Sequence, residues 1–257
     1  MRAALPAALV LASAAAWANA PVARAQPQPT GAIRGQVRFA GATPQVARLT
    51  VEDDQDFCGA TMTNSWLRVS PTGGVADVVV YLADFNAGHA SPVNQTVASD
   101  HVHCEITPRI RIVQPGTTLV LRNSDPIFHS TRLRVLGTKL FPFGSGLPPA
   151  GTPYETPAQR LYQPGFYQLE CTDGHPLERG YLIVAAHPYY ALTAADGTFE
   201  LDRVPPGRYT TVAWHPGWTF ATDPINGLGQ FAAQKSSVSV TVIAGQTATV
   251  ALTLGAH

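Results

Sequence analysis

A short loop that carries a cysteine and a histidine between two strand-like runs constrains this chain more than any other stretch. The loop reads CTDGHPLE, residues 171–178. The runs on either side, GFYQLE (165–170) and YLIVAA (181–186), are short and mostly apolar, as strands are. A thiolate and a nearby imidazole can bind one soft metal ion, and copper favours a thiolate, one or two imidazoles and a weak axial group. The loop therefore predicts a metal centre where two strands end.

The second imidazole that copper needs is predicted upstream, at His129. This residue lies in the stretch NSDPIFHS (123–130), which closes a strand-like run, TTLVLR (117–122). Taken singly, a buried cysteine is usually a small hydrophobe, and a histidine is usually a packed or solvated residue. His129, Cys171 and His175 together, each near the end of a strand-like run, favour a metal site over those separate interpretations.

The two stretches resemble the copper loops of the cupredoxin family, the plastocyanin- and azurin-like proteins. The resemblance lies in Asn-Ser-Asp-Pro-x-x-His-Ser and, about forty residues later, in Pro-Gly-x-Tyr-x-x-x-Cys-x-x-Gly-His. It implies a Greek-key β-sandwich with His129, Cys171 and His175 as copper ligands. The family's axial methionine falls at Glu178. That residue is then either an axial oxygen ligand or a solvent-facing side chain that pairs with Arg179.

The loop also resembles the copper loop of cytochrome oxidase subunit II, which carries a second cysteine four residues before the first. Tyr167 occupies that place here, so a binuclear site is not expected. Neither of the 2 methionines is close to the loop in sequence, which argues against an ordinary methionine-ligated site. Ser130, Asn123 and backbone amides near Cys171 are expected to fix the orientation of the ligands.

The first 25 residues are predicted to be a signal peptide and leader. Arg2 is followed by an Ala/Leu/Val run (3–16) and by small-x-small cleavage sites that end at Ala20 and Ala25. A membrane anchor is the alternative, but a proline interrupts the run and it ends too soon to span a bilayer. We therefore expect a periplasmic protein without a membrane span.

Three cysteines, Cys58, Cys104 and Cys171, follow that leader. In an oxidising compartment two of them are expected to pair, which leaves one over. If Cys171 binds copper, Cys58 and Cys104 form the disulfide. The alternative is that all three thiols stay free.

The remainder of the chain consists of strand-like runs joined by turns, and no helix of ordinary length is apparent beyond the leader. The class is therefore all-β. Predicted strands include residues 31–39, 75–82, 106–113 and 117–123. Residues 86–100 are predicted to be a loop, and 144–157 a long surface excursion rich in Gly, Pro and Ser.

The late chain resembles a second family, the carboxypeptidase regulatory-like (transthyretin-like, or prealbumin-like) β-sandwich. The resemblance lies in DGTFEL (196–201), PPGRYT (205–210) and AGQTATV (244–250). That family also has two earlier strands, and their counterparts here, 35–37 and 79–82, lie over a hundred residues upstream.

This separation predicts an inserted domain. We expect a cupredoxin domain (99–187) between the early strands (31–98) and the remaining strands (188–257) of one small prealbumin-like sandwich. Two domains in series are the alternative. The dipeptide Trp214-His215 is expected to pack within the late sandwich.

The formal net charge is 0 and 13% of the residues are charged, so neither a nucleic acid nor a membrane surface is indicated as a partner. The leading interpretation is a copper protein that carries single electrons for an unidentified redox partner protein. A copper carrier or storage module is one alternative, and a non-redox binding or structural module with a vestigial metal site is another. No nucleophile triad, phosphate-binding glycine loop or paired carboxylates are apparent, so no enzyme is expected. His101 and His103 alternate on one strand, where solvation is favoured over a surface metal site.

Overall fold

The computed structural model describes residues 29–46, 48–85, 92–150, 159–222 and 229–255. These residues are almost entirely strands and turns, and their one helix, α1 (Gln55–Cys58), is 4 residues long. Within them, no helix has the length and apolar character needed to cross a bilayer. The predicted signal peptide lies outside the described residues. The all-β class predicted from the sequence is confirmed.

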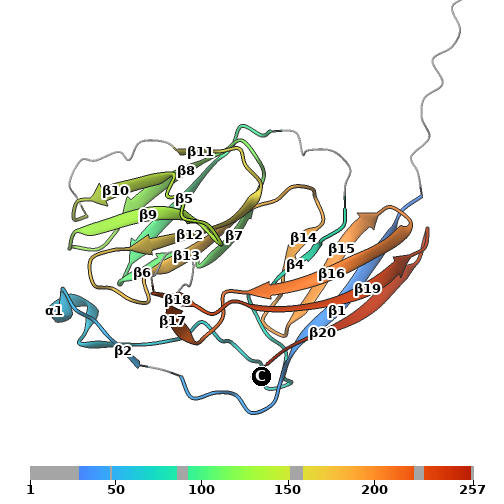
Figure 1. The fold of residues 1–257 in the computed structure, drawn as a ribbon, viewed down its shortest axis with the longest axis horizontal. Coiled ribbons are helices and arrows are strands. Elements are labelled where there is room, and N and C mark those ends of the chain that lie inside the picture. The colour runs from blue at the N-terminus through green and yellow to red at the C-terminus, as the bar shows by residue number, and fades with distance from the viewer. Residues whose placement is uncertain (1–28, 47, 86–91, 151–158, 223–228, 256–257) are drawn as a thin grey trace, which may run out of the picture.

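The strands from β5 to β13 form one body, called here the central body (Figure 1). Its larger sheet has the order β10 (Phe143–Leu147), β9 (His129–Val135), β12 (Gly165–Cys171), β13 (Arg179–Val184) and β7 (Ile110–Val113). Its smaller sheet has the order β11 (Gln159–Leu161), β8 (Thr117–Asn123), β5 (Thr96–Val102) and β6 (Glu105–Thr107). Apolar side chains of both sheets form a single core between them, which includes Leu119, Leu133, Leu169 and Leu182.

The second body, the terminal body, combines early and late strands (Figure 1). One sheet has the order β15 (Thr198–Val204), β1 (Gly31–Ala40) and β20 (Thr247–Gly255), with β1 parallel to β20 and antiparallel to β15. The other has the order β14 (Tyr190–Leu192), β4 (Val79–Leu82), β16 (Gly207–His215) and β19 (Gln234–Val242). Strands β1 and β4 therefore share sheets with strands that follow the whole central body in sequence.

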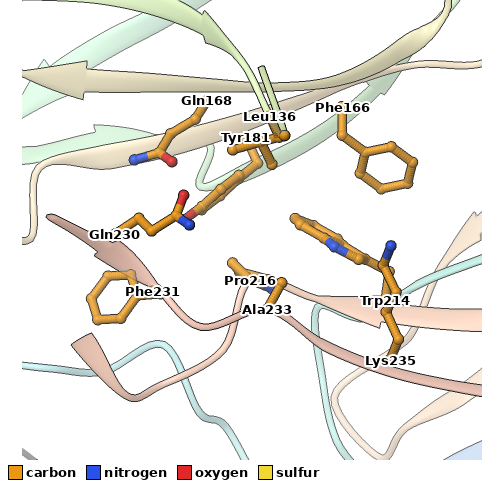
Figure 2. A pocket seen from close by; sticks show the side chains of 11 residues that line it. Leu136, Phe166, Gln168, Tyr181, Trp214, Pro216, Gln230, Phe231, Ala233 and Lys235 are labelled. Atoms are coloured by element: carbon orange, nitrogen blue, oxygen red, sulfur yellow. The ribbon is translucent and has the colours of Figure 1, made fainter. Parts of the chain in front are cut away.

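A third apolar cluster joins the two bodies. It explains why β13 is buried on both faces, since its alternate side chains enter different cores. Leu182 packs into the core of the central body, whereas Tyr181 packs into the joining cluster. Trp214 also belongs to the joining cluster, with its ring 4.8 Å from that of Phe166 and 5.5 Å from that of Tyr181. Trp214, which was expected to pack within the late sandwich, therefore packs between the two bodies instead of in the core of the terminal body (Figure 2).

Two short ribbons complete the described strands. They are β2 (Arg48–Thr50) with β3 (Thr61–Thr63), and β17 (Phe220–Thr222) with β18 (Gly229–Phe231).

Several strand predictions are confirmed and others need correction. The predicted strand 117–123 is β8, whereas the run 106–113 divides into β6 and β7. The part of the predicted loop 86–100 from Thr96 onward is β5. Its polar sequence hides the strand because two of its polar side chains, Ser99 and His101, are buried. The first residues of the predicted excursion 144–157 belong to β10, and residues 151–158 lie outside the described residues.

Candidate metal centre

Two strand ends and one connecting loop bring the predicted ligands together. His129 begins β9, Cys171 ends the neighbouring strand β12, and the loop into β13 carries His175 and Glu178. Because Cys171 is in register with Thr131 on β9, the cysteine and His129 meet at the same end of the sheet. The exposed fractions of the four predicted ligands are 0% for His129, 8% for Cys171, 2% for His175 and 0% for Glu178.

The donor atoms of these four side chains all lie within 4.8 Å of one another. Cys171 Sγ is 3.7 Å from His129 Nδ1 and 3.6 Å from His175 Nδ1. Glu178 Oε2 is 3.0 and 3.1 Å from the same two nitrogens. Both imidazoles therefore direct Nδ1 toward the thiol and the carboxylate.

Backbone hydrogen bonds hold the loop closed. Cys171 N donates to Glu178 O at 3.0 Å, and Glu178 N donates to His175 O at 3.1 Å. Gly174 has a φ of +72°, a left-handed conformation that favours glycine. The segment from Cys171 to Glu178 thus forms a compact turn, in which the side chains of Cys171, His175 and Glu178 converge.

His129 is oriented from its other ring nitrogen, by a carboxylate that sequence reasoning missed. His129 Nε2 lies 3.2 Å from Asp125 Oδ2, and Asp125 also accepts hydrogen bonds from the backbone N–H groups of His103 and Cys104. Asn123, which was expected to orient the ligands, acts indirectly, through the backbone of the turn before His129. It accepts a hydrogen bond from Asp125 N and donates to Ile127 O at 2.7 Å, so it shapes the turn that precedes His129.

Two further contacts, both with the carboxylate of Asp173, lie beside Cys171. Ser130 N donates to the carboxylate of Asp173, and Asp173 Oδ2 is 3.8 Å from Cys171 Sγ. Ser130 therefore acts through its backbone, and the Asp173 carboxylate is a second acid that sequence reasoning did not single out.

His101 is the largest difference from expectation. It is 1% exposed, so the prediction that it is solvated is wrong. Its Nδ1 lies 2.5 Å from Glu178 Oε1 and its Nε2 lies 2.6 Å from Thr131 Oγ1. Its ring stacks on that of His129 at 4.6 Å. The expectation that His101 and His103 share one strand is also wrong, because β5 ends at Val102 and His103 lies in the turn that follows, with a φ of 52°. Only a contact across 77 residues reveals that His101 holds Glu178.

Glu178 is neither solvent-facing nor paired with Arg179, so that alternative is wrong. Arg179 instead donates to Glu170 at 2.6 Å. Burial opposes ionisation of Glu178, but hydrogen bonds with His101, His129 and His175 outweigh burial and hold the pKa of the carboxyl well below its usual value. Glu178 is therefore an anion at the centre of the site.

The pKa of the Cys171 thiol is shifted in the opposite direction to that of Glu178. Burial and the neighbouring charge of Glu178 raise the pKa of the Cys171 thiol far above its usual value. A bound metal cation offsets both effects, because the thiol loses its proton when it binds the ion and the cation stabilises the resulting thiolate. The thiol is thus suited to a metal and poorly suited to act as a free nucleophile.

A separate segment, residues 48–63, covers the loop and is called here the cover. It consists of β2, α1 and β3. Glu52 N donates to Gly174 O at 3.0 Å, and a Cβ on Gly174 would lie 2.8 Å from atoms of Glu52 and Asp53. His175 Nε2 is buried without a hydrogen-bond partner among the described residues, although Asp54 Oδ2 is 3.5 Å away. The cover therefore shields the ring edge of His175 from solvent.

The predicted disulfide fastens this cover to the central body. Cys58 at the end of α1 is bonded to Cys104, with a Cα–Cα distance of 5.8 Å, and Cys171 is the free cysteine. Beside the bond, Phe57 stacks on His103 with ring centroids 6.3 Å apart. The pairing of Cys58 with Cys104 that the sequence predicted is confirmed.

The donor set fits copper. Protein ligands bind transition-metal ions at about 2.0 to 2.3 Å, so donors that share one ion lie roughly 3.3 to 3.7 Å apart. The four separations that join the thiol or the carboxylate to the two imidazoles, 3.0 to 3.7 Å, are close to that range. Calcium and magnesium prefer sets of oxygen ligands, whereas thiolate and imidazole suit copper.

Comparisons with known proteins give limited likenesses. The sequence profile of polysaccharide lyase family 4, domain II, matches residues 184–250. The carboxypeptidase regulatory-like identity predicted for that part of the chain is not confirmed. No curated protein matches the sequence.

Similar solved structures are cupredoxins and a larger copper enzyme. A purple cupredoxin from Nitrosopumilus maritimus is 17% identical with a TM-score of 0.29, over 35% of this chain and 99% of that one. Amicyanin from Paracoccus versutus is 17% identical with a TM-score of 0.30, over 41% of this chain and 97% of that one. A copper-containing nitrite reductase from Thermus scotoductus is 20% identical with a TM-score of 0.29, over 40% of this chain and 25% of that one. At these scores the likenesses carry no weight for function, which must be argued from the site.

Proposed function

We propose that this protein binds one copper ion through His129, Cys171, His175 and Glu178 and carries single electrons. The observation that carries the proposal is the convergence of a thiol, two imidazole Nδ1 atoms and a carboxylate within 4.8 Å in a buried site. Bound copper would supply a one-electron couple between its cuprous and cupric states. The chain's part is to hold the donors in place in both states, so that little rearrangement accompanies each transfer.

Burial favours an electron carrier over a copper carrier. A carrier has to release its ion to a recipient, which requires an accessible ligand. Here His129 and Glu178 are 0% exposed, and the disulfide-bonded cover lies over His175. Electrons can cross such a cover without any ligand leaving the metal. The proposal includes a redox partner protein and assigns no catalytic step to the chain.

The first test is the visible spectrum of the purified chain with one equivalent of cupric ion. We expect an intense thiolate-to-copper band, and reduction and reoxidation of the copper at one fixed potential. Cys171→Ser should remove the band, whereas Thr172→Ala, on the exposed side of the same loop, should keep it. Survival of the spectrum and of the copper stoichiometry in Cys171→Ser would overturn the site. Irreversible loss of copper on reduction would favour the copper carrier instead.

The role of Glu178 has its own test. A carboxylate stabilises the more highly charged cupric ion, whereas a thioether is neutral and soft. Glu178→Met should therefore raise the reduction potential and shift the spectrum toward that of an ordinary blue copper site. An unchanged potential and spectrum would mean that Glu178 does not bind the ion.

The periplasm is proposed as the location, on the basis of the sequence of residues 1–25 and of the disulfide between Cys58 and Cys104. Mass spectrometry of the protein from an osmotic-shock fraction tests this. We expect a mature chain that begins after Ala20 or Ala25, with the disulfide formed. Recovery of the uncut chain in the cytoplasm, with reduced thiols, would contradict it.

A further inference from the structure

The outer ring nitrogens of the two predicted imidazole ligands have different surroundings. Both rings direct Nδ1 toward the thiol, so a metal bound at Nδ1 leaves each ring with its proton on Nε2. At His129 this nitrogen lies 3.2 Å from the carboxylate of Asp125. At His175 it is buried and has no hydrogen-bond partner among the described residues. Because a metal-bound imidazole almost always donates its other N–H group, His175 needs an acceptor at this edge.

The cover places a carboxylate beside that edge. Asp54 Oδ2 lies 3.5 Å from His175 Nε2, which is close enough for an ion pair but longer than an ordinary hydrogen bond. The Asp54 side chain is 38% exposed, so it has room to move, and a shift of about half an ångström would close the bond. The backbone carbonyl of Asp53 is a second acceptor beside this ring, but its approach does not have the geometry of a hydrogen bond.

The backbone of Asp54 is unusual in a way that favours this role. Its φ of 54° and ψ of 34° are left-handed, a conformation that residues other than glycine adopt rarely and mostly where the surrounding structure requires it. Asp54 begins α1, and its carbonyl accepts hydrogen bonds from the N–H groups of Phe57 and Cys58 at 3.0 and 2.9 Å. An aspartate at this position usually caps the helix with its carboxylate, but here the side chain makes no capping bond. The carboxylate is therefore left for His175.

The disulfide connects the supports of the two carboxylates that face the imidazoles. Asp125 accepts a hydrogen bond from the backbone N–H of Cys104 at 2.9 Å. Cys104 is bonded to Cys58, which ends the short helix that Asp54 begins. One cross-link thus holds the segment beside each ring, with Asp125 on one side of the metal site and Asp54 on the other.

We propose that Asp54 is the positioning carboxylate of His175 and that the disulfide between Cys58 and Cys104 holds it in place. This rests on the proposed function, since it requires a metal at His175 Nδ1. With Nδ1 occupied, the Nε2–H group donates to Asp54, which fixes the plane of the ring and makes the imidazole a stronger donor to the metal. The cover then acts on the metal site as well as shielding it.

The test uses the full chain, with its disulfide formed, and zinc as the probe. Zinc binds thiolate, imidazole and carboxylate ligands, is diamagnetic, and needs no redox step. Asp54→Gly removes the carboxylate and suits the left-handed backbone, so the cover should keep its fold. In NMR spectra of the zinc-loaded protein, this change should speed exchange of the His175 Nε2–H proton with water by about three- to tenfold. It should also weaken zinc binding by roughly ten- to hundredfold.

Two further variants separate positioning from charge and from folding. Asp54→Asn keeps an acceptor oxygen in a residue that tolerates the left-handed region, and should restore protection of the proton to near the wild-type level. Asp56→Asn removes the same charge from an exposed acid of the same helix, and should change neither the proton nor the zinc affinity. With copper, Asp54→Gly should raise the reduction potential, because a weaker imidazole donor stabilises the cupric ion less. A merely structural role would instead lower the stability of the metal-free protein, which Asp54→Gly should not do.

The part played by the disulfide is tested by combining changes. Cys58→Ser with Cys104→Ser should speed exchange of the same proton about as much as Asp54→Gly, and adding Asp54→Gly to that pair should have little further effect. Full additivity would overturn the coupling to the disulfide.

The assignment of Asp54 is overturned if Asp54→Gly leaves the proton protected and zinc affinity unchanged, or if Asp56→Asn has an equal effect. Zinc binding with the expected effects but without a reversible copper couple would refute the electron carrier alone. A reversible copper couple that Asp54→Gly leaves unaltered would refute this assignment alone.

Discussion

The metal end of the central body and the core of the terminal body are equally well buried, but opposite kinds of side chain fill them. The core of the terminal body is apolar and includes Ile33, Val80, Leu201 and Leu252. The metal end holds polar and ionisable groups that are at most 2% exposed: His101, Asp125, His129, His175 and Glu178. Apolar burial is favourable by itself, whereas buried polar groups are costly unless each finds a partner.

This difference shows that packing alone satisfies the core of the terminal body, whereas the metal end is arranged to bind a cation. The terminal core is complete once its sheets pack together. At the metal end, Glu178 lies among three imidazoles and beside a thiol whose pKa is raised, which is a donor set assembled for a cation. We expect the two regions to respond differently to copper, to loss of the disulfide, to acid and to single substitutions.

Copper should have the largest effect, and only on the central body. An ion that binds the folded state alone adds about 4 kcal/mol at a thousandfold excess over its Kd. Amide hydrogen exchange in β9 and β12 should therefore slow on copper addition, while exchange in β1 and β20 stays the same. An equal slowing in both bodies would mean that they open as one unit, and the contrast between them would not hold.

Removal of the disulfide should follow closely in size. Cys58 and Cys104 are separated by 46 residues, and closing such a loop stabilises the folded state by roughly 4 kcal/mol at most. The double change Cys58→Ser with Cys104→Ser should destabilise the cover and speed copper exchange, with little change in β1 and β20. Thiol titration of the unfolded, unreduced and metal-free wild-type protein should find one thiol. Three thiols would contradict the pairing.

Acid should act on the terminal body through His215, which is 0% exposed. Burial lowers the pKa of His215 to about 4. In the unfolded chain this imidazole gains its proton near pH 6.5, so the free energy of unfolding should fall between pH 6.5 and pH 4, by up to about 3 kcal/mol. His215→Gln removes the titration and should flatten the pH dependence of unfolding, measured by tryptophan fluorescence. An unchanged slope would mean that other groups set the acid response.

The smallest effect is expected from His101, which contacts Glu178 and none of the other predicted ligands by a hydrogen bond. His101→Leu should leave copper stoichiometry intact and lower the reduction potential slightly, opposite to Glu178→Met, because a carboxylate that loses a hydrogen bond is a stronger donor to the cupric ion. His103→Leu is the matched control, because His103 stacks on Phe57 and does not touch the ligands. If both changes leave the potential unaltered, His101 only fills space.

The sequence predicted those parts of the site that follow from local spacing. Cys171, His175 and Glu178 share one loop, and His129 ends a recognisable turn, so their convergence could be expected. Strands with regular apolar alternation, such as β8, were equally accessible.

The parts that could not be predicted depend on contacts between distant segments. His101 reaches Glu178 across 77 residues, and Asp125 is recognisable as an orienting group only from its 3.2 Å approach to His129. Strand β5 has a polar sequence because it faces buried polar partners, so periodicity gave no signal. The cover could not be foreseen beyond the disulfide, since no local pattern says which surface a short ribbon will protect.

The parallel pairing of β1 with β20 has a mechanical consequence. Ala32 lies beside Thr247 and Ala40 beside Gly255, so tension applied before residue 31 and after residue 255 pulls on opposite ends of one ladder. Force of that kind loads all the hydrogen bonds of the ladder together in shear instead of opening them one at a time. Because the chain from 41 to 246 lies between these two strands, it carries none of the tension while the ladder holds. The metal end would therefore keep its geometry under a pull that reaches the protein through its two ends.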